Sequence, residues 1–96
     1  ISRMPALKLD LALVVDESVP ADEMEGAIWE NGGALLVDVV LFDVFRGEQL
    51  GAGNKSLAYS LTFQSPDKTL KSKQANKQRD RIVRALQKEY GAEIRS

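Results

Sequence analysis

The stretch LFDVFRGEQLGAGNKSLAYSLTFQ, residues 41–64, decides the fold of this chain. It contains the end of an apolar run, a loop with three glycines and Asn54, and then residues 56–64, in which apolar and polar side chains alternate. Alternation with a period of two is typical of a β-strand with one buried face, and glycine and asparagine mark turns. The stretch therefore predicts a long β-hairpin, and the rest of the chain is arranged around it.

Each predicted strand of the hairpin has two different faces. In residues 56–64, the face expected in the core carries Leu57, Tyr59, Leu61 and Phe63. The opposite face carries the small or polar residues Ser56, Ala58, Ser60, Thr62 and Gln64. In the apolar run at residues 34–45, an unbroken period of two places Leu36, Val40, Phe42 and Val44 toward the core. The same period places Val39, Leu41, Asp43 and Phe45 on the other face.

The segment before the hairpin is predicted to form a strand and a helix. Leucine or valine at every second position of residues 7–15 indicates a strand with one face in the core. Pro20 and the acidic residues after it are typical of a helix start, and Gly32-Gly33 is typical of a left-handed helix end. The buried face of this helix is expected to carry Met24, Ala27 and Ile28.

The segment after the hairpin is predicted to form a second helix and a short last strand. Ser72 is the expected cap of the helix and Gly91 ends it, and the last strand covers residues 92–94. The helix is expected to bury Ala75, Ile82, Val83, Leu86 and Tyr90.

The order strand, helix, strand, strand, helix, strand predicts an α+β, ferredoxin-like fold. Such a chain forms a four-stranded antiparallel sheet with both helices on one face. The other face of the sheet stays open. We expect that open face to carry Asp10, Ala12, Asp43, Phe45, Ala58, Ser60 and Thr62.

The composition of the 96 residues limits the chemistry that is available. The length suits one domain, and the opening isoleucine suggests that residues 1–96 are a single domain excised from a longer chain. Cysteine and histidine are absent, which removes disulfides, thiol catalysis, the usual general base and the commonest metal ligand. We therefore expect no catalytic site and no metal site. We also expect no membrane span, since no apolar run approaches the roughly 20 residues that a bilayer requires.

Charge is distributed unevenly along the chain. Residues 1–45 carry two basic and nine acidic side chains, whereas residues 46–96 carry eleven and five, so the two parts have net charges of −7 and +6. Seven cations fall within residues 71–89, either as a solvated helix face or as a patch that binds phosphates. For the strand carboxylates, exposure to solvent is the more common outcome, and a site for a hard cation is the alternative. These carboxylates are Asp10, Asp16, Asp38 and Asp43.

An ordered set of short motifs runs through the chain. They are Ser2-Arg3-Met4-Pro5-Ala6, Asp10-Leu11-Ala12, Val14-Val15-Asp16, Phe42-Asp43-Val44-Phe45-Arg46-Gly47, Lys55-Ser56-Leu57-Ala58-Tyr59, Leu61-Thr62-Phe63-Gln64, Thr69-Leu70 and Gly91-Ala92-Glu93-Ile94-Arg95. Together they resemble the C-terminal ferredoxin-fold anticodon-binding domain of the bacterial phenylalanine-tRNA ligase β subunit, from end to end. Two places depart from that family: Leu9 replaces its usual arginine, and Lys71-Ser72-Lys73-Gln74 opens a helix that usually begins with acidic residues.

The resemblance implies a tRNA-binding module without chemistry of its own. In that family the domain docks the anticodon region of tRNA(Phe), while a catalytic α subunit carries out aminoacylation with ATP and magnesium. The implied partners are tRNA(Phe), the rest of the β subunit and the α subunit, in the cytoplasm, and an organellar single-chain ligase is the alternative parent. The fold alone also allows a regulatory or protein-interaction domain that does not bind RNA.

The resemblance also implies which residues contact RNA. On the open face and its approach these are Ser2, Arg3, Asp10, Ala12, Asp43, Phe45, Ala58 and Ser60. Arg46, Lys55 and the helix cations are the implied phosphate contacts. For Asp10, Asp43 and Arg46, salt bridges at the strand ends are an equally open interpretation.

Overall fold

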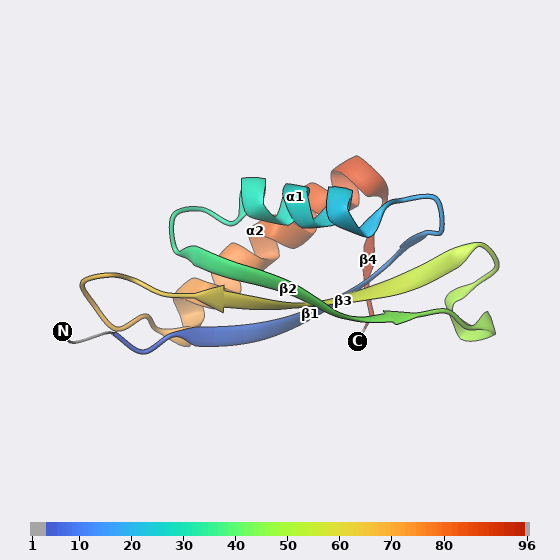
Figure 1. Ribbon diagram of the computed structural model, residues 1–96. Coiled ribbons are helices and arrows are strands. Elements are labelled where there is room, and N and C mark those ends of the chain that lie inside the picture. The colour runs from blue at the N-terminus through green and yellow to red at the C-terminus, as the bar shows by residue number, and fades with distance from the viewer. Residues whose placement is uncertain (1–3, 96) are drawn as a thin grey trace.

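A computed structural model describes residues 4–95 of the protein. Its elements are β1 (Leu7–Asp16), α1 (Ala21–Asn31), β2 (Leu36–Phe45), the short 3₁₀ helix η1 (Glu48–Leu50), β3 (Asn54–Phe63), α2 (Ser72–Tyr90) and β4 (Glu93–Ile94). The strands form one antiparallel sheet in the order β2-β3-β1-β4, and both helices cover the same face of it (Figure 1). The predicted ferredoxin-like α+β fold is confirmed.

Strand β3 lies between β1 and β2 and carries the centre of the core. Its predicted inward side chains, Leu57, Tyr59, Leu61 and Phe63, are at most 1% exposed. The Tyr59 hydroxyl donates a hydrogen bond of 2.8 Å to the carbonyl of Ala21 and so ties the sheet to the start of α1. Burial raises the pKa of the Tyr59 hydroxyl well above its ordinary value, so this donor keeps its proton.

The buried faces of the two helices are largely as predicted. Met24, Ala27 and Ile28 of α1 are buried, and so are Ala75, Ile82, Val83 and Leu86 of α2, while Tyr90 is half-buried. The helix ends need glycine at two places, because Gly33 and Gly91 have φ angles of +75° and +66°, in the left-handed region. Neither described helix combines the length and the apolarity needed to cross a bilayer.

The cap of α2 differs from the prediction. The N-cap residue is Lys71, and Ser72 is already the first helical residue. The backbone N–H of Lys71 donates to Oε1 of Gln74 at 3.0 Å. The Gln74 side chain therefore accepts a hydrogen bond from the backbone N–H of the N-cap residue, as in a capping box, and the predicted serine cap is absent.

Strand β2 departs from the predicted alternation. Register shifts interrupt its pairing with β3 between Leu36 and Asp38 and again between Leu41 and Asp43. Each β-bulge adds one residue to β2 and so reverses which side chains face the helices. The prediction of one unbroken period of two is therefore wrong for the middle of this strand.

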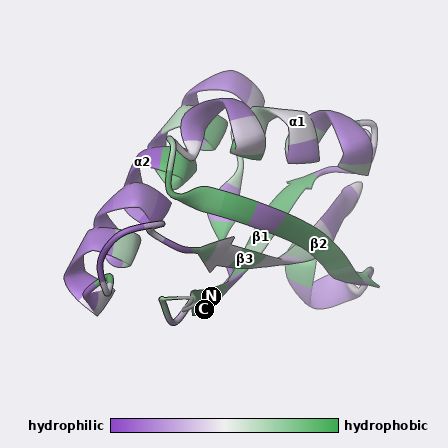
Figure 2. Ribbon diagram, turned by 60° about the vertical axis from the view of Figure 1, so that its left-hand side comes forward, coloured by the Kyte–Doolittle hydropathy of each residue, from purple (hydrophilic) through white to green (hydrophobic). Residues whose placement is uncertain are grey.

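The observed register gives the true faces of β2. On the helix side, opposite the core residues of β3, lie Leu36, Val39, Leu41 and Val44. Val40 lies opposite Ser60 on the open face and is 47% exposed, and Phe42, left unpaired by the second bulge, is 55% exposed. Asp43 and Phe45 face the open side, as predicted. By residue hydropathy, β2 is mainly hydrophobic along an edge of the sheet, while much of the two helices is hydrophilic (Figure 2).

Two alanine substitutions distinguish the bulged register from the unbroken one. We expect Val39→Ala to lower the free energy of unfolding by about 2 kcal/mol, because it removes buried methyl groups and leaves a cavity. We expect Phe42→Ala to change it by no more than about 0.5 kcal/mol, because Phe42 is largely in solvent. Urea denaturation followed by circular dichroism measures both values, and a larger loss for Phe42→Ala would contradict the bulges.

Candidate nucleic-acid interface

The open face is built from three rows of side chains that run across the sheet. Residues paired directly in an antiparallel sheet point to the same side, and neighbouring strands lie about 4.8 Å apart. The rows, from β1 through β3 to β2, are Asp10, Ser60 and Val40; Ala12, Ala58 and Asp43; and Val14, Ser56 and Phe45. The structure thus brings together all six open-face residues proposed as RNA contacts. Thr62, paired with Lys8 and Asp38, extends the same surface.

The middle of this surface is low and its borders are polar. Ala12 and Ala58 are neighbours in adjacent strands and both are partly exposed, so their own side chains add only methyl groups above the backbone. Asp10 and Asp43 are exposed on either side, and neither forms an ion pair with another residue of the described range 4–95. Their carboxylates are therefore left as hydrogen-bond acceptors at the edges of a flat, small-residue surface.

Phe45 is held in place by two contacts. A Cβ atom at Gly47 would lie 2.9 Å from Cζ of the Phe45 ring, so the ring packs directly against the glycine backbone. On the open face, the guanidinium carbon of Arg95 lies 4.6 Å from the centre of the ring, which is cation–π geometry. Arg95 was not among the predicted contacts. The signal that could have found it is that the segment after Gly91 pairs with β1, which places residue 95 beside Ala12.

A charged cluster lies at the end of the sheet nearest the hairpin loop. Nε and Nη2 of Arg46 donate to the two carboxylate oxygens of Glu17, the second at 3.1 Å, and Nζ of Lys55 lies 3.4 Å from Oε2. The Arg46 hydrogen bond and charge hold the pKa of the Glu17 carboxyl below its usual range. The salt-bridge interpretation of Arg46 is therefore the one seen in the structure.

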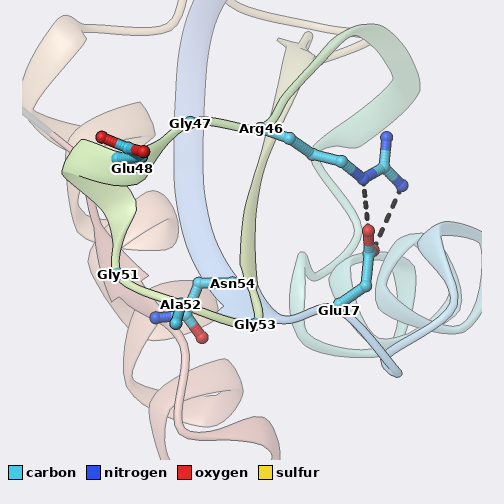
Figure 3. Close-up of a pocket in the computed structure, with 8 residues that line it drawn as sticks. All are labelled: Glu17, Arg46, Gly47, Glu48, Gly51, Ala52, Gly53 and Asn54. Carbon is cyan, nitrogen blue, oxygen red and sulfur yellow. Dashed lines mark hydrogen bonds and ion pairs between the residues drawn. The ribbon is translucent and has the colours of Figure 1, made fainter.

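The cluster borders a pocket of about 320 Å³ in the loop (Figure 3). Glu17 and Arg46 reach toward each other at one side of it, and the glycine-containing loop forms the other side. Its lining residues are Glu17, Arg46, Gly47, Glu48, Gly51, Ala52, Gly53 and Asn54. Since acidic and basic groups here neutralise each other, the pocket lacks the one-sided positive charge of a phosphate site.

The remaining predicted contacts lie elsewhere. Lys55 is 7% exposed and pairs with Val15, whose side chain is buried beneath the helices, so its ammonium group is turned away from the open face. Helix α2, with its cations, covers the opposite side of the sheet (Figure 1). Ser2 and Arg3 lie outside the described residues. Within residues 4–95, no group of three or more acidic side chains is placed to hold a metal ion.

Comparison with known proteins finds one matching family and relatives that share one name. The family described as ferredoxin-fold anticodon binding domain matches residues 2–95. Phenylalanine–tRNA ligase β subunits of Corynebacterium efficiens, Clostridium tetani and Streptomyces avermitilis are 48%, 44% and 47% identical over 99%, 97% and 100% of this chain. The chain spans only 11%, 12% and 12% of the length of these relatives.

Replacing the carboxylate that joins Arg46 and Lys55 tests the charged cluster. The folded-state pKa of Glu17 lies below its ordinary value of 4.5, so its ionised form stabilises the fold above that pH. This contribution is lost as the pH falls through the folded-state pKa. We expect Glu17→Gln to lower the urea midpoint at pH 7, and the difference from the unmodified chain to shrink at pH 3.

Glu48→Gln is the matched control, because Glu48 lines the same pocket without an ion pair to any residue of the described range. It should leave the midpoint at pH 7 nearly unchanged. Hydrogen bonds from Ser18 also lower the pKa of Asp16, but that pH dependence is common to all three proteins and cancels in the comparison. Equal midpoints for Glu17→Gln and Glu48→Gln would show that the cluster does not stabilise the fold.

Proposed function

The chain belongs to the family of ferredoxin-fold anticodon-binding domains, and we propose on that basis that its open face binds unpaired nucleotides in the anticodon region of tRNA(Phe). The observation that carries the proposal is the pair Ala12 and Ala58 at the centre of the open face. Their methyl groups leave room close to the sheet for flat groups, both for the Arg95 side chain that reaches Phe45 and for a base. Phe45 and Asp43 stand beside this low surface, with an aromatic ring and a hydrogen-bond acceptor.

The chemistry of this surface matches the needs of single-stranded RNA. Unpaired bases are bound by stacking on flat groups and by hydrogen bonds to their exposed edges. Asp43 and Asp10 can accept from the amino or imino groups of a base, and Ser60 can donate or accept. The carboxylates favour base edges and disfavour phosphates, so the RNA backbone would pass along the rim of the face.

We propose further that the chain works as one module of a phenylalanine-tRNA ligase β subunit. The proposal is supported by the relatives, which carry that name and are about eight to nine times as long as the segment they share with this chain. The parent ligase would use ATP and magnesium in its catalytic α subunit, and this module would position tRNA(Phe) for it. Its partners would be that α subunit and the rest of the β subunit, in the cytoplasm.

A protein-interaction role is the second candidate, and the edge strand β2 favours it. Val37, Val40, Phe42 and Val44 expose between 40% and 55% of their surface along this unpaired edge. The occupant we consider is the remainder of the longer polypeptide, since relatives place this segment in a much larger chain. Strand β2 also carries Asp43 and Phe45 of the proposed RNA site, so the two roles share this strand.

Open-face substitutions test the RNA-binding role. We expect Phe45→Ala to weaken binding of an anticodon stem-loop of tRNA(Phe) by about 1–3 kcal/mol, the range for loss of one base–aromatic stack. Ser60→Glu should weaken it as well, because a long anionic side chain would stand over the low surface. Fluorescence anisotropy with labelled RNA measures both affinities.

Ser72→Glu is the matched control, since it adds the same charge on α2, which packs on the other side of the sheet. It should reduce affinity much less than Ser60→Glu. Equal losses would mean that RNA responds only to net charge. Unchanged affinity in both Phe45→Ala and Ser60→Glu would remove the open face from the proposal.

A further inference from the structure

Arg95 crosses the open face from one side of the sheet to the other. Its backbone N–H donates to the carbonyl of Ala12 at 2.9 Å, which fixes its main chain at the outer side of β1. Its guanidinium nevertheless reaches Phe45 on β2, with β1 and β3 in between. The side chain can pass there because Ala12, Ala58 and Ser56 of the two central strands are small on this face.

The Phe45 ring packs against the backbone of Gly47. The φ angle of Gly47 is −172°, extended backbone that any residue can adopt, so its glycine is not needed for backbone conformation. A Cβ there would come within 2.9 Å and 3.1 Å of the Phe45 ring and 2.7 Å of Gln49 Oε1, so the missing side chain leaves the ring room to pack on this backbone. With the glycine backbone on one side and Arg95 on another, the ring presents a preorganised support for the guanidinium.

Within residues 4–95, the side-chain donors of Arg95 have no partner. Among the described residues, no carboxylate forms an ion pair with its guanidinium and no side chain accepts a hydrogen bond from it. A guanidinium carries five N–H donors in its plane and can stack through its flat faces. Held against Phe45, it keeps its edge donors available.

We propose that Arg95 is a further RNA-contact residue, which stacks an unpaired base on its guanidinium and donates to the phosphate of the same strand. This inference rests on the proposed function. It makes the stacking unit of the open face a pair, Phe45 with Arg95, rather than Phe45 alone. It also brings a cation to a face whose other charged groups near the centre are the carboxylates of Asp10 and Asp43.

A structural role is the competing account, in which Arg95 only fastens β4 across the sheet. The two accounts differ in what a lysine can replace. Lysine keeps the charge but loses the plane and the fork of donors, and glutamine loses the charge as well. Binding through a phosphate also makes the affinity depend on salt. Each phosphate contact to single-stranded RNA contributes about −0.7 to the slope of log K against log salt concentration.

The experiment measures binding of the tRNA(Phe) anticodon stem-loop over a range of KCl concentrations for the unmodified chain, Arg95→Lys and Arg95→Gln. We expect Arg95→Lys to bind about tenfold more weakly with the salt slope unchanged, since one stacking plane is lost. Arg95→Gln should bind still more weakly, with the slope reduced in magnitude by about 0.7. In Phe45→Leu, which removes the ring that supports the guanidinium, Arg95→Lys should cost clearly less than tenfold.

Arg84→Lys and Arg84→Gln are matched controls, because Arg84 is exposed on α2 and pairs with no carboxylate of residues 4–95. Both variants should leave the affinity for RNA and the salt slope nearly unchanged. Thermal unfolding of every variant shows whether it is folded at the assay temperature. Wild-type affinity in folded Arg95→Lys and Arg95→Gln would overturn the inference, while weakening by Phe45→Ala or Ser60→Glu would still support the proposed function. An unmodified chain that does not bind RNA would overturn both.

Discussion

The pairing of β3 with strands on both sides is the constraint on which the rest of this structure depends. Because β3 is central, its alternate side chains must serve two surfaces at once. Leu57, Tyr59, Leu61 and Phe63 fill the core under the helices, and the residues between them form the floor of the open face. A slip of one residue would exchange these sets and destroy both surfaces together. Core and candidate site are therefore two results of one register.

That constraint explains which sequence predictions were confirmed. Strands β1 and β3 pair without interruption, so hydrophobic alternation identified their faces correctly. In β2 nearly every position is apolar, which gives the pattern no signal for a bulge, and the first bulge reversed the faces of Val39 and Val40. Asp43 and Phe45 were nevertheless placed correctly, because the second bulge restores the parity that the first one shifts.

The sequence predicted which residues form the centre of the candidate site, but it did not predict the positions of Arg95 and Lys55. Residues on one uninterrupted face could be grouped from spacing alone, as Ala12, Ala58 and Ser60 were. The contact between Arg95 and Phe45 joins opposite sides of a four-stranded sheet, and no local pattern encodes it. Lys55 shows the converse, since a lysine in a strand looks like a surface cation until its burial and its partner Glu17 are known.

The uninterrupted pairing of β1 with β3 also bears on how the molecule folds. Leu7 pairs with Phe63 and Asp16 with Asn54, across most of the chain, whereas the hairpin of β2 and β3 closes over a short loop. Closing long loops costs more entropy and slows folding, so local hairpin contacts form more readily than the pairing of β1. Strand β4 can add only once β1 is in place. The open face combines residues of β1, β2 and β3 with Arg95 after β4, so it is complete only when all four strands are paired.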